Sequence, residues 1–131
     1  MNLEISTTNR FTDEEVSDIL CCAVEGGIGY WAILDNTTAD WLEARKEVRL
    51  KSGGGFTLED VAIAVLENGK SIHLIDIEDE EEIYSFNKED FETGIRMAIE
   101  NKYWDGNVDT ADAETGDIII QYACFGDIVF G

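Results

Sequence analysis

Three segments of the sequence carry the same signal for the start of a helix. Each has Thr or Asn at the N-cap, an acidic residue three positions later, and apolar residues just before the cap and at the fourth helical position; the segments are 11–16, 56–61 and 86–91. Together these features form a capping box and a hydrophobic staple, in which the cap side chain binds a free backbone N–H group. The signal is local, so it predicts three helices that begin at residues 13, 58 and 88.

The expected helices have apolar residues at helical spacing and end at Gly or polar residues. We expect four of them, over residues 13–25, 58–68, 88–102 and from after Thr110 to Gly126. The pair Gly26-Gly27 ends the first helix, and Asn68-Gly69 ends the second, because glycine readily adopts the left-handed conformation that follows many helices.

Short segments rich in β-forming residues lie between these helices. Strands are expected at 3–7, 30–34 and 71–77, with 82–86 completing a hairpin through an acidic turn. Residues 48–51 are expected to form a short edge strand. Because strands and helices do not alternate regularly, we predict one α+β domain over residues 1–131, with a small, mainly antiparallel sheet packed against the helices.

The charge of the chain is strongly negative and unevenly placed. The 131 residues include 29 acidic and 9 basic ones, which gives a net charge of −20. Hydrophobic residues make up 44% of the chain, which is enough to build a folded core. Residues 53–131 hold 19 acids and 4 bases, a net charge of −15. Such a chain repels phosphate, so direct binding to nucleic acid or to an anionic membrane is not expected. Its partners, if charged, should be basic.

The longest apolar run has six residues, 61–66, whereas a membrane-spanning helix needs ~18. The first four residues are mixed and polar, without the charged and then apolar pattern of a secretion signal. We therefore expect a soluble, cytoplasmic protein.

Two apparent ligand motifs fail on physical grounds. Residues 27–32 fit G-x-G-x-x-A as letters, but a helix ends and a strand begins there, which reverses the order that a nucleotide site needs. Residues 105–109 resemble the start of a calcium loop, but the sixth position is Thr110 and the twelfth is Gly116, where Gly and Glu are required. We expect no cofactor and no metal site.

The nucleophiles and the base of the chain also form no catalytic pattern. Cys21, Cys22 and Cys124 match neither a disulfide framework nor a zinc motif, so free thiols are expected. His73 is the one histidine and lies in an expected strand, where a structural imidazole is more common than a general base. We predict that the protein is not an enzyme.

The remaining functional signal is the acidic surface. It can simply keep the protein soluble, or adapt it to salt. Alternatively, ordered carboxylates can imitate the phosphate rows of a duplex and enter the basic channel of a nucleic-acid-binding protein. The residues predicted to bind such a partner are Asp76, Glu78, Asp79, Glu80, Glu81, Glu82, Glu89, Asp90, Asp109, Asp112 and Glu114.

Two further segments carry a resemblance to known proteins. They are 25–31, EGGIGYW, and 113–131, AETGDIIIQYACFGDIVFG; the middle segment 70–84 is also similar. In these segments the chain resembles a family of small proteins of unknown function carried by phages, prophages and other mobile elements. The resemblance implies a role in the cytoplasm of a bacterial host, where compact acidic proteins of mobile elements act as anti-restriction or anti-CRISPR inhibitors. It carries over no catalytic residues.

Two other functions stay open at this point. One is a structural phage protein. The other is a small-ligand module that sequesters a defence-signalling nucleotide, in which an aromatic ring stacks on the base and basic side chains hold the phosphate. The residues available for this second role are Tyr30, Trp31, Trp41, Trp104, Arg45, Lys46 and Arg49.

Overall fold

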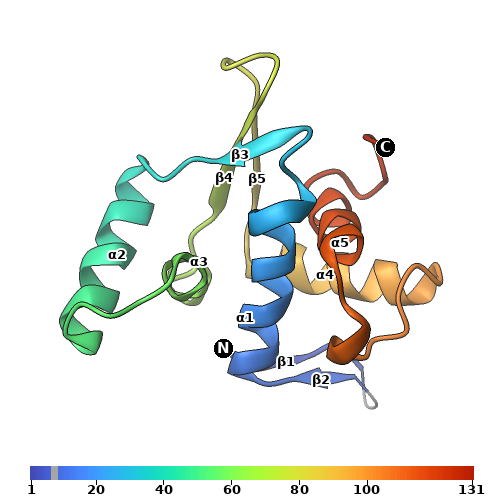
Figure 1. Cartoon of the computed structure of the whole chain (residues 1–131), viewed down its shortest axis with the longest axis horizontal. Helices are drawn as coiled ribbons and strands as arrows, with labels where there is room; N and C mark the ends of the chain where they lie inside the picture. The colour runs from blue at the N-terminus through green and yellow to red at the C-terminus, as the bar shows by residue number, and fades with distance from the viewer. Residues whose placement is uncertain (7–8) are drawn as a thin grey trace.

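The computed structural model describes residues 1–6 and 9–131, and over these residues the chain forms five α-helices and two small antiparallel sheets (Figure 1). The predicted α+β fold is confirmed. In chain order the elements are β1 (Leu3–Glu4), β2 (Arg10–Phe11), α1 (Asp13–Cys22), the π-helical turn η1 (Ala23–Gly27), β3 (Ala32–Leu34), α2 (Ala39–Ser52), α3 (Leu58–Glu67), β4 (Ile72–Asp76), β5 (Ile83–Phe86), α4 (Lys88–Glu100), the 3₁₀ turn η2 (Val108–Thr110) and α5 (Ala113–Phe125).

The three predicted helix starts are confirmed. Thr12, Thr57 and Asn87 are the N-caps of α1, α3 and α4, and each forms a complete capping box. The first helix differs at its end, because its α-helical part stops at Cys22 and the chain continues as the wider turn of η1. The fourth predicted helix is α5, and Asp112 is its N-cap.

The expected edge strand at 48–51 is wrong, because these residues belong to α2. Thr38 caps the start of this helix, and Gly53 ends it with a φ of 73°, a left-handed conformation that glycine adopts without strain. Only Trp41 and Ala44 of α2 are buried. The helix therefore lacks the wide apolar stripe that periodicity detects.

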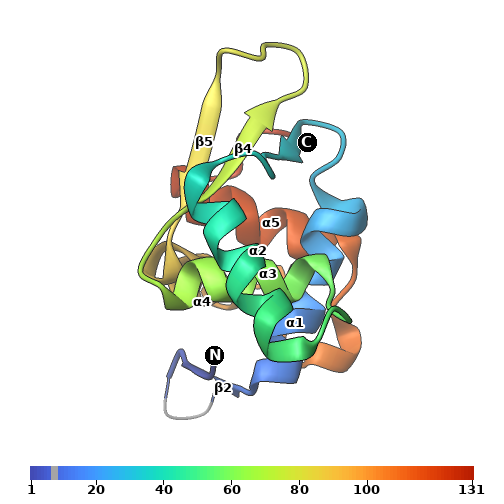
Figure 2. The ribbon, with the colours of Figure 1, turned by 90° about the vertical axis from the view of Figure 1, so that its left-hand side faces the viewer.

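The larger sheet has the strand order β3-β4-β5, and both pairs are antiparallel. Leu74 of β4 lies between Leu34 and Tyr84 in this register, and the predicted β4–β5 hairpin is confirmed. Its turn extends beyond the helices in both views (Figures 1 and 2). The smaller sheet pairs β1 with β2. The expected strand 3–7 is thus shorter, and its last residue lies outside the described residues.

The core is built around α5, whose residues from Thr115 to Ala123 are all buried. Glycines let its neighbours approach closely. A Cβ atom on Gly116 would lie 2.5 Å from the backbone nitrogen of Ala23, and one on Gly27 would lie 2.5 Å from the carbonyl oxygen of Ala113. The backbones of η1 and α5 are therefore in direct contact. None of the described helices combines the length and the apolar character needed to cross a bilayer.

Candidate functional site

Six of the predicted partner-binding residues lie together on the turn between β4 and β5. We name this group the acidic hairpin: Asp76, Glu78, Asp79, Glu80, Glu81 and Glu82. Five of them are exposed and Asp76 is partly buried. The turn projects from the body of the protein, at the top of Figure 1, so its carboxylates can be reached from several directions.

The acidic hairpin is ordered by its own carboxylates. Asp76 Oδ1 accepts hydrogen bonds from the backbone N–H groups of Glu78, at 2.8 Å, and Asp79, at 3.1 Å. Asp79 Oδ1 accepts another from the N–H of Glu81 at 3.1 Å. Such side-chain contacts to the backbone two or three residues later are typical of a defined turn. The charged surface therefore has a fixed backbone.

A tyrosine connects this turn to the sheet. The hydroxyl of Tyr84 donates a hydrogen bond to Asp76 Oδ2 at 2.7 Å. This bond, together with the backbone N–H groups of Glu78 and Asp79, stabilises the ionised carboxylate and lowers the pKa of Asp76. The same bond raises the pKa of Tyr84 to about 12, because the proton stays on the phenol beside a negative charge.

The acidic hairpin has no basic partner within the described part of the chain. The ion pairs found there join the N-terminal amine to Asp13 and Glu67, Arg10 to Glu4, and Lys88 to Glu92. None of these pairs includes a hairpin carboxylate, so no basic side chain described by the structure neutralises the negative field of the hairpin.

The other five predicted residues lie outside the acidic hairpin. Glu89 and Asp90 are in the first turn of α4, and Asp90 Oδ2 accepts a hydrogen bond from the N–H of Asn87 at 3.0 Å. Asp90 is therefore a capping residue.

The last three of the predicted residues are placed far from the acidic hairpin. Asp109 lies in η2, Asp112 caps α5, and Glu114 is in the first turn of α5. The hairpin is at the upper end of the molecule in both views, whereas η2 is near the lower end (Figures 1 and 2). The eleven predicted residues thus do not form one face, and the largest group of them that lies together is the acidic hairpin.

The residues considered for nucleotide binding are not brought together either. Trp31, Trp41 and Trp104 are buried in the core, and the Trp31 ring stacks on Phe130 at 4.9 Å between centroids. Tyr30 is half exposed, but it lies near α5, on the opposite side of the molecule from α2 (Figure 1). The basic residues considered with them are all on α2: Arg45, Lys46 and Arg49.

The two motifs that carry the family resemblance meet at one buried carboxylate. Asp117 accepts hydrogen bonds from the Tyr30 hydroxyl at 2.5 Å, from Trp31 Nε1 at 2.7 Å and from Gln121 Nε2 at 2.9 Å. Desolvation and the bond to Asp117 raise the pKa of Tyr30 to about 12. All three donors belong to side chains of the fold, so the contacts of this carboxylate are those of a structural residue.

The three thiols are free, as expected. Burial raises the pKa of Cys124 to about 12. The pKa of Cys21 is also raised to about 12, first because its thiol donates a hydrogen bond to Glu25 Oε2 at 2.9 Å and then because of burial. Both thiols thus stay protonated at neutral pH and are poor nucleophiles.

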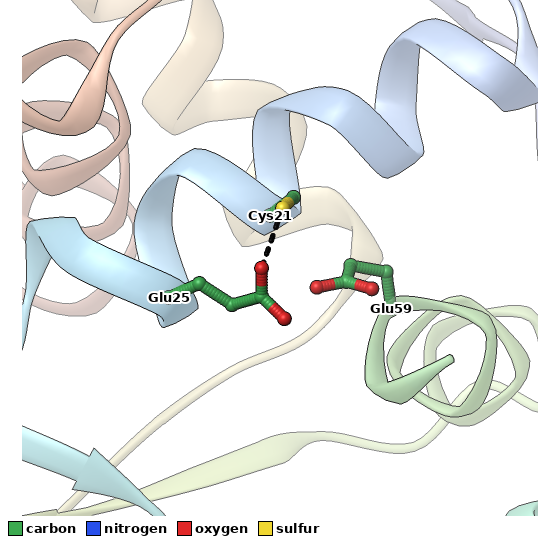
Figure 3. A group of neighbouring side chains, drawn as sticks. All are labelled: Cys21, Glu25 and Glu59. Carbon is green, nitrogen blue, oxygen red and sulfur yellow. Dashed lines mark hydrogen bonds between the residues drawn. The ribbon is translucent and has the colours of Figure 1, made fainter.

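One further cluster was missed by sequence reasoning. Cys21, Glu25 and Glu59 come from α1, η1 and α3, and each has a potential ligand atom within 4.8 Å of the other two (Figure 3). The only sequence signal is the spacing of four between Cys21 and Glu25, which puts them on one face of a helix. Glu59 joins them through the packing of α3 against α1.

The resemblance to mobile-element proteins rests on the motifs 25–31 and 113–131. It stays a prediction, because comparison of the chain with protein-family models, curated proteins and solved structures gives no match.

Proposed function

We propose that the protein is a non-enzymatic inhibitor whose acidic hairpin occupies the basic nucleic-acid channel of a host defence nuclease, of the CRISPR-effector or restriction class. The observation that carries this proposal is the hairpin itself. It presents six carboxylates on one projecting turn, its backbone is held by Asp76 and Asp79, and no ion pair among the described residues neutralises it. The partner would be a basic, nucleic-acid-binding protein.

Charge complementarity suits such a competitor. Negative groups that face a channel lined by Lys and Arg speed association and exclude partners of the wrong charge. Order in the turn adds to this, because side chains and loops that are already fixed lose less entropy on binding. The bonds from Tyr84 and from the turn backbone to Asp76 supply that order.

The hairpin also offers apolar contact area. Ile77 and Ile83 flank the acidic turn, and both are exposed. Stable interfaces combine a desolvated apolar centre with a polar rim, and each partner typically buries ~800 Å². The two isoleucines supply the apolar part and the six carboxylates supply the polar part, both on one projecting turn. A surface that serves only solubility has no need of the exposed isoleucines.

The proposal is tested by nuclease inhibition. The purified protein is added to a panel of CRISPR effectors and restriction nucleases, and DNA cleavage is measured. The hairpin variant removes four charges (Asp79→Asn, Glu80→Gln, Glu81→Gln, Glu82→Gln). The matched control removes four charges from exposed positions on α1, α2 and α4 (Glu14→Gln, Asp18→Asn, Glu43→Gln, Glu100→Gln).

For a susceptible nuclease, we expect the wild type and the control variant to inhibit cleavage equally. The hairpin variant should reach the same inhibition only at a concentration at least about tenfold higher. A tenfold change corresponds to about 1.4 kcal/mol of binding free energy. Equal inhibition by both variants would show that general acidity acts and not the hairpin. Unaffected cleavage by every nuclease of the panel would overturn the proposal for these two classes.

A further inference from the structure

The cluster of Cys21, Glu25 and Glu59 contains an unusual carboxylate. Glu59 lies in the first turn of α3 and is only 5% exposed. Its Oε1 atom has no hydrogen-bond partner among the described residues. A buried acceptor without a partner destabilises the fold, and more so when it is charged. The cluster therefore lacks a group that would interact with this oxygen.

The neighbours of Glu59 make the position less favourable still. Its carboxylate faces that of Glu25, and Figure 3 shows the two side chains pointing toward one another with the Cys21 sulfur beside them. Two like charges at this separation repel each other. None of the ion pairs in the described part of the chain includes either residue. A cation bound between them would remove both the repulsion and the unpaired oxygen.

The donor atoms indicate which cation fits. One sulfur and two carboxylate oxygens match the ligand types of Zn²⁺, which binds thiolate at ~2.3 Å and carboxylate at ~2.0–2.2 Å. Ca²⁺ and Mg²⁺ prefer oxygen donors alone. In a tetrahedral zinc site the ligand atoms are roughly 3.3–3.8 Å apart, as these bond lengths require. The ligand atoms of the cluster all lie within 4.8 Å of one another, so a metal ion needs only a small approach of the three side chains.

The local backbone positions the ligands. Cys21 and Glu25 are one helical turn apart, and the chain changes from α1 to the wider η1 between them. π-Helical turns of this kind are frequent at functional sites. The third ligand comes from α3, which packs against α1. A bound ion would therefore join two helices that are separate in the chain.

We propose that Cys21, Glu25 and Glu59 bind one divalent transition-metal ion of the zinc class, with water at the fourth position. On binding, the Cys21 thiol releases its proton to solvent, and its hydrogen bond to Glu25 is replaced by a bond from sulfur to the metal. One oxygen of each carboxylate completes the protein ligands. This site is independent of the acidic hairpin and of the function proposed for it.

The test uses Co²⁺ as a spectroscopic probe on the full chain after chelator treatment. A thiolate bound to Co²⁺ gives a charge-transfer absorption band that carboxylates alone do not produce. We expect this band to saturate at one equivalent of Co²⁺ and to disappear on addition of Zn²⁺. The stoichiometry matters because a chain with 29 acidic residues also binds cations loosely.

Variants locate the site. Cys21→Ser should abolish the band, whereas the adjacent Cys22→Ser should keep it. Glu59→Gln and Glu25→Gln should each keep the band but weaken Co²⁺ binding at least about tenfold. Glu25 is exposed, so its variant should fold, as circular dichroism would verify, even if Glu59→Gln does not. Absence of the band in the folded wild type would overturn the proposal, and so would an unchanged band in Cys21→Ser.

Discussion

The indole Nε1 of Trp31 donates a hydrogen bond to Asp117 Oδ1 at 2.7 Å, across 86 residues of chain. Both residues are buried, with 2% and 7% of their surfaces exposed. The bond joins the segment before β3 to the middle of α5. It thereby connects the two motifs on which the family resemblance rests, and gives them a shared structural reason.

The same network holds the C-terminal segment. Gln121 Oε1 accepts hydrogen bonds from the backbone N–H groups of Val129 and Phe130, each at 2.8 Å, and the Phe130 ring stacks on Trp31. Gln121 is itself fully buried. A polar group in this position stabilises the fold only because both its oxygen and its nitrogen have partners.

We predict that Asp117→Ala lowers the free energy of unfolding by about 2–4 kcal/mol, because it leaves the buried indole N–H of Trp31 without an acceptor and takes one acceptor from Gln121 Nε2, which keeps its bond to the Phe130 carbonyl oxygen. Urea unfolding monitored by tryptophan fluorescence measures the change. The control is Glu114→Ala in the same helix, where the side chain is exposed and the expected change is within about 0.5 kcal/mol. Equal stability of the two variants would show that the buried network is not a major source of stability.

A glycine substitution tests the contact between α5 and η1. Gly116→Ala would place a Cβ atom 2.5 Å from the backbone nitrogen of Ala23. Although alanine favours a helix by about 1 kcal/mol over glycine, we expect a net loss of about 1–3 kcal/mol, since two backbones must separate.

The matched control for this contact is Gly29→Ala. No atom lies within 4 Å of a Cβ at Gly29, so its melting temperature should stay close to that of the wild type. A melting temperature of Gly116→Ala at or above the wild-type value would contradict the close packing.

The bond between Tyr84 and Asp76 predicts a pH effect. The pKa of Tyr84 is raised to about 12 from an ordinary value of 10.0. We expect Asp76→Asn to lower the pKa of Tyr84 toward 10. Ultraviolet titration of the phenolates would detect this as one tyrosine fewer among those that ionise near pH 12. Tyr30, whose pKa is also raised to about 12 by burial and Asp117, should still ionise late and serves as the internal control. An unchanged titration curve would argue against the bond.

The directions of these two pKa shifts determine how the stability of the fold changes with pH. Because the pKa of Tyr84 is raised, its contribution to the free energy of unfolding is present below pH 10 and is lost as the pH rises through about 12. Because the pKa of Asp76 is lowered, its contribution to the free energy of unfolding is present above pH 3.8, its ordinary pKa. That contribution is lost as the pH falls through the pKa of Asp76 in the folded protein. Tyr84→Phe should therefore raise the pKa of Asp76 toward 3.8, as a carboxyl ¹³C titration would measure.

Much of the fold was predictable because its signals are local. The caps Thr12, Thr57 and Asn87 act within one helical turn, and the β4–β5 hairpin follows from two β-rich segments around an acidic turn. Local hydrogen bonds of this kind do not depend on the rest of the structure. The acidic hairpin was predictable for the same reason.

Helix α2 was not predictable from its periodicity. It buries little more than Trp41 and Ala44 against the rest of the protein, so β-branched and apolar residues near its end, Val48 and Leu50, suggested a strand. The decisive features are its ends, Thr38 and Gly53. The N-cap Thr38 is not followed by an acidic residue at the third helical position, where Trp41 stands, so no capping box marked the start of the helix.

The buried sites depend on contacts between distant segments. Asp117 meets Trp31, and Glu59 meets Cys21, only after α5 and α3 have packed against the rest of the protein. A single sequence does not reveal which of 29 acidic residues becomes buried. The acids at the helix starts were misleading in a similar way, since Asp90 and Asp112 serve as capping residues.

The most direct test of the acidic hairpin as a competitor of nucleic acid is its affinity for an inhibited nuclease over a salt series. We expect the affinity of the wild type and of the four-charge control variant to fall at least about tenfold between ~50 and ~200 mM salt. The reason is that salt weakens contacts in which carboxylates take the place of phosphates. The hairpin variant should bind more weakly and depend less on salt. An affinity that hardly changes with salt, or the same slope for the hairpin variant and the wild type, would contradict the proposal.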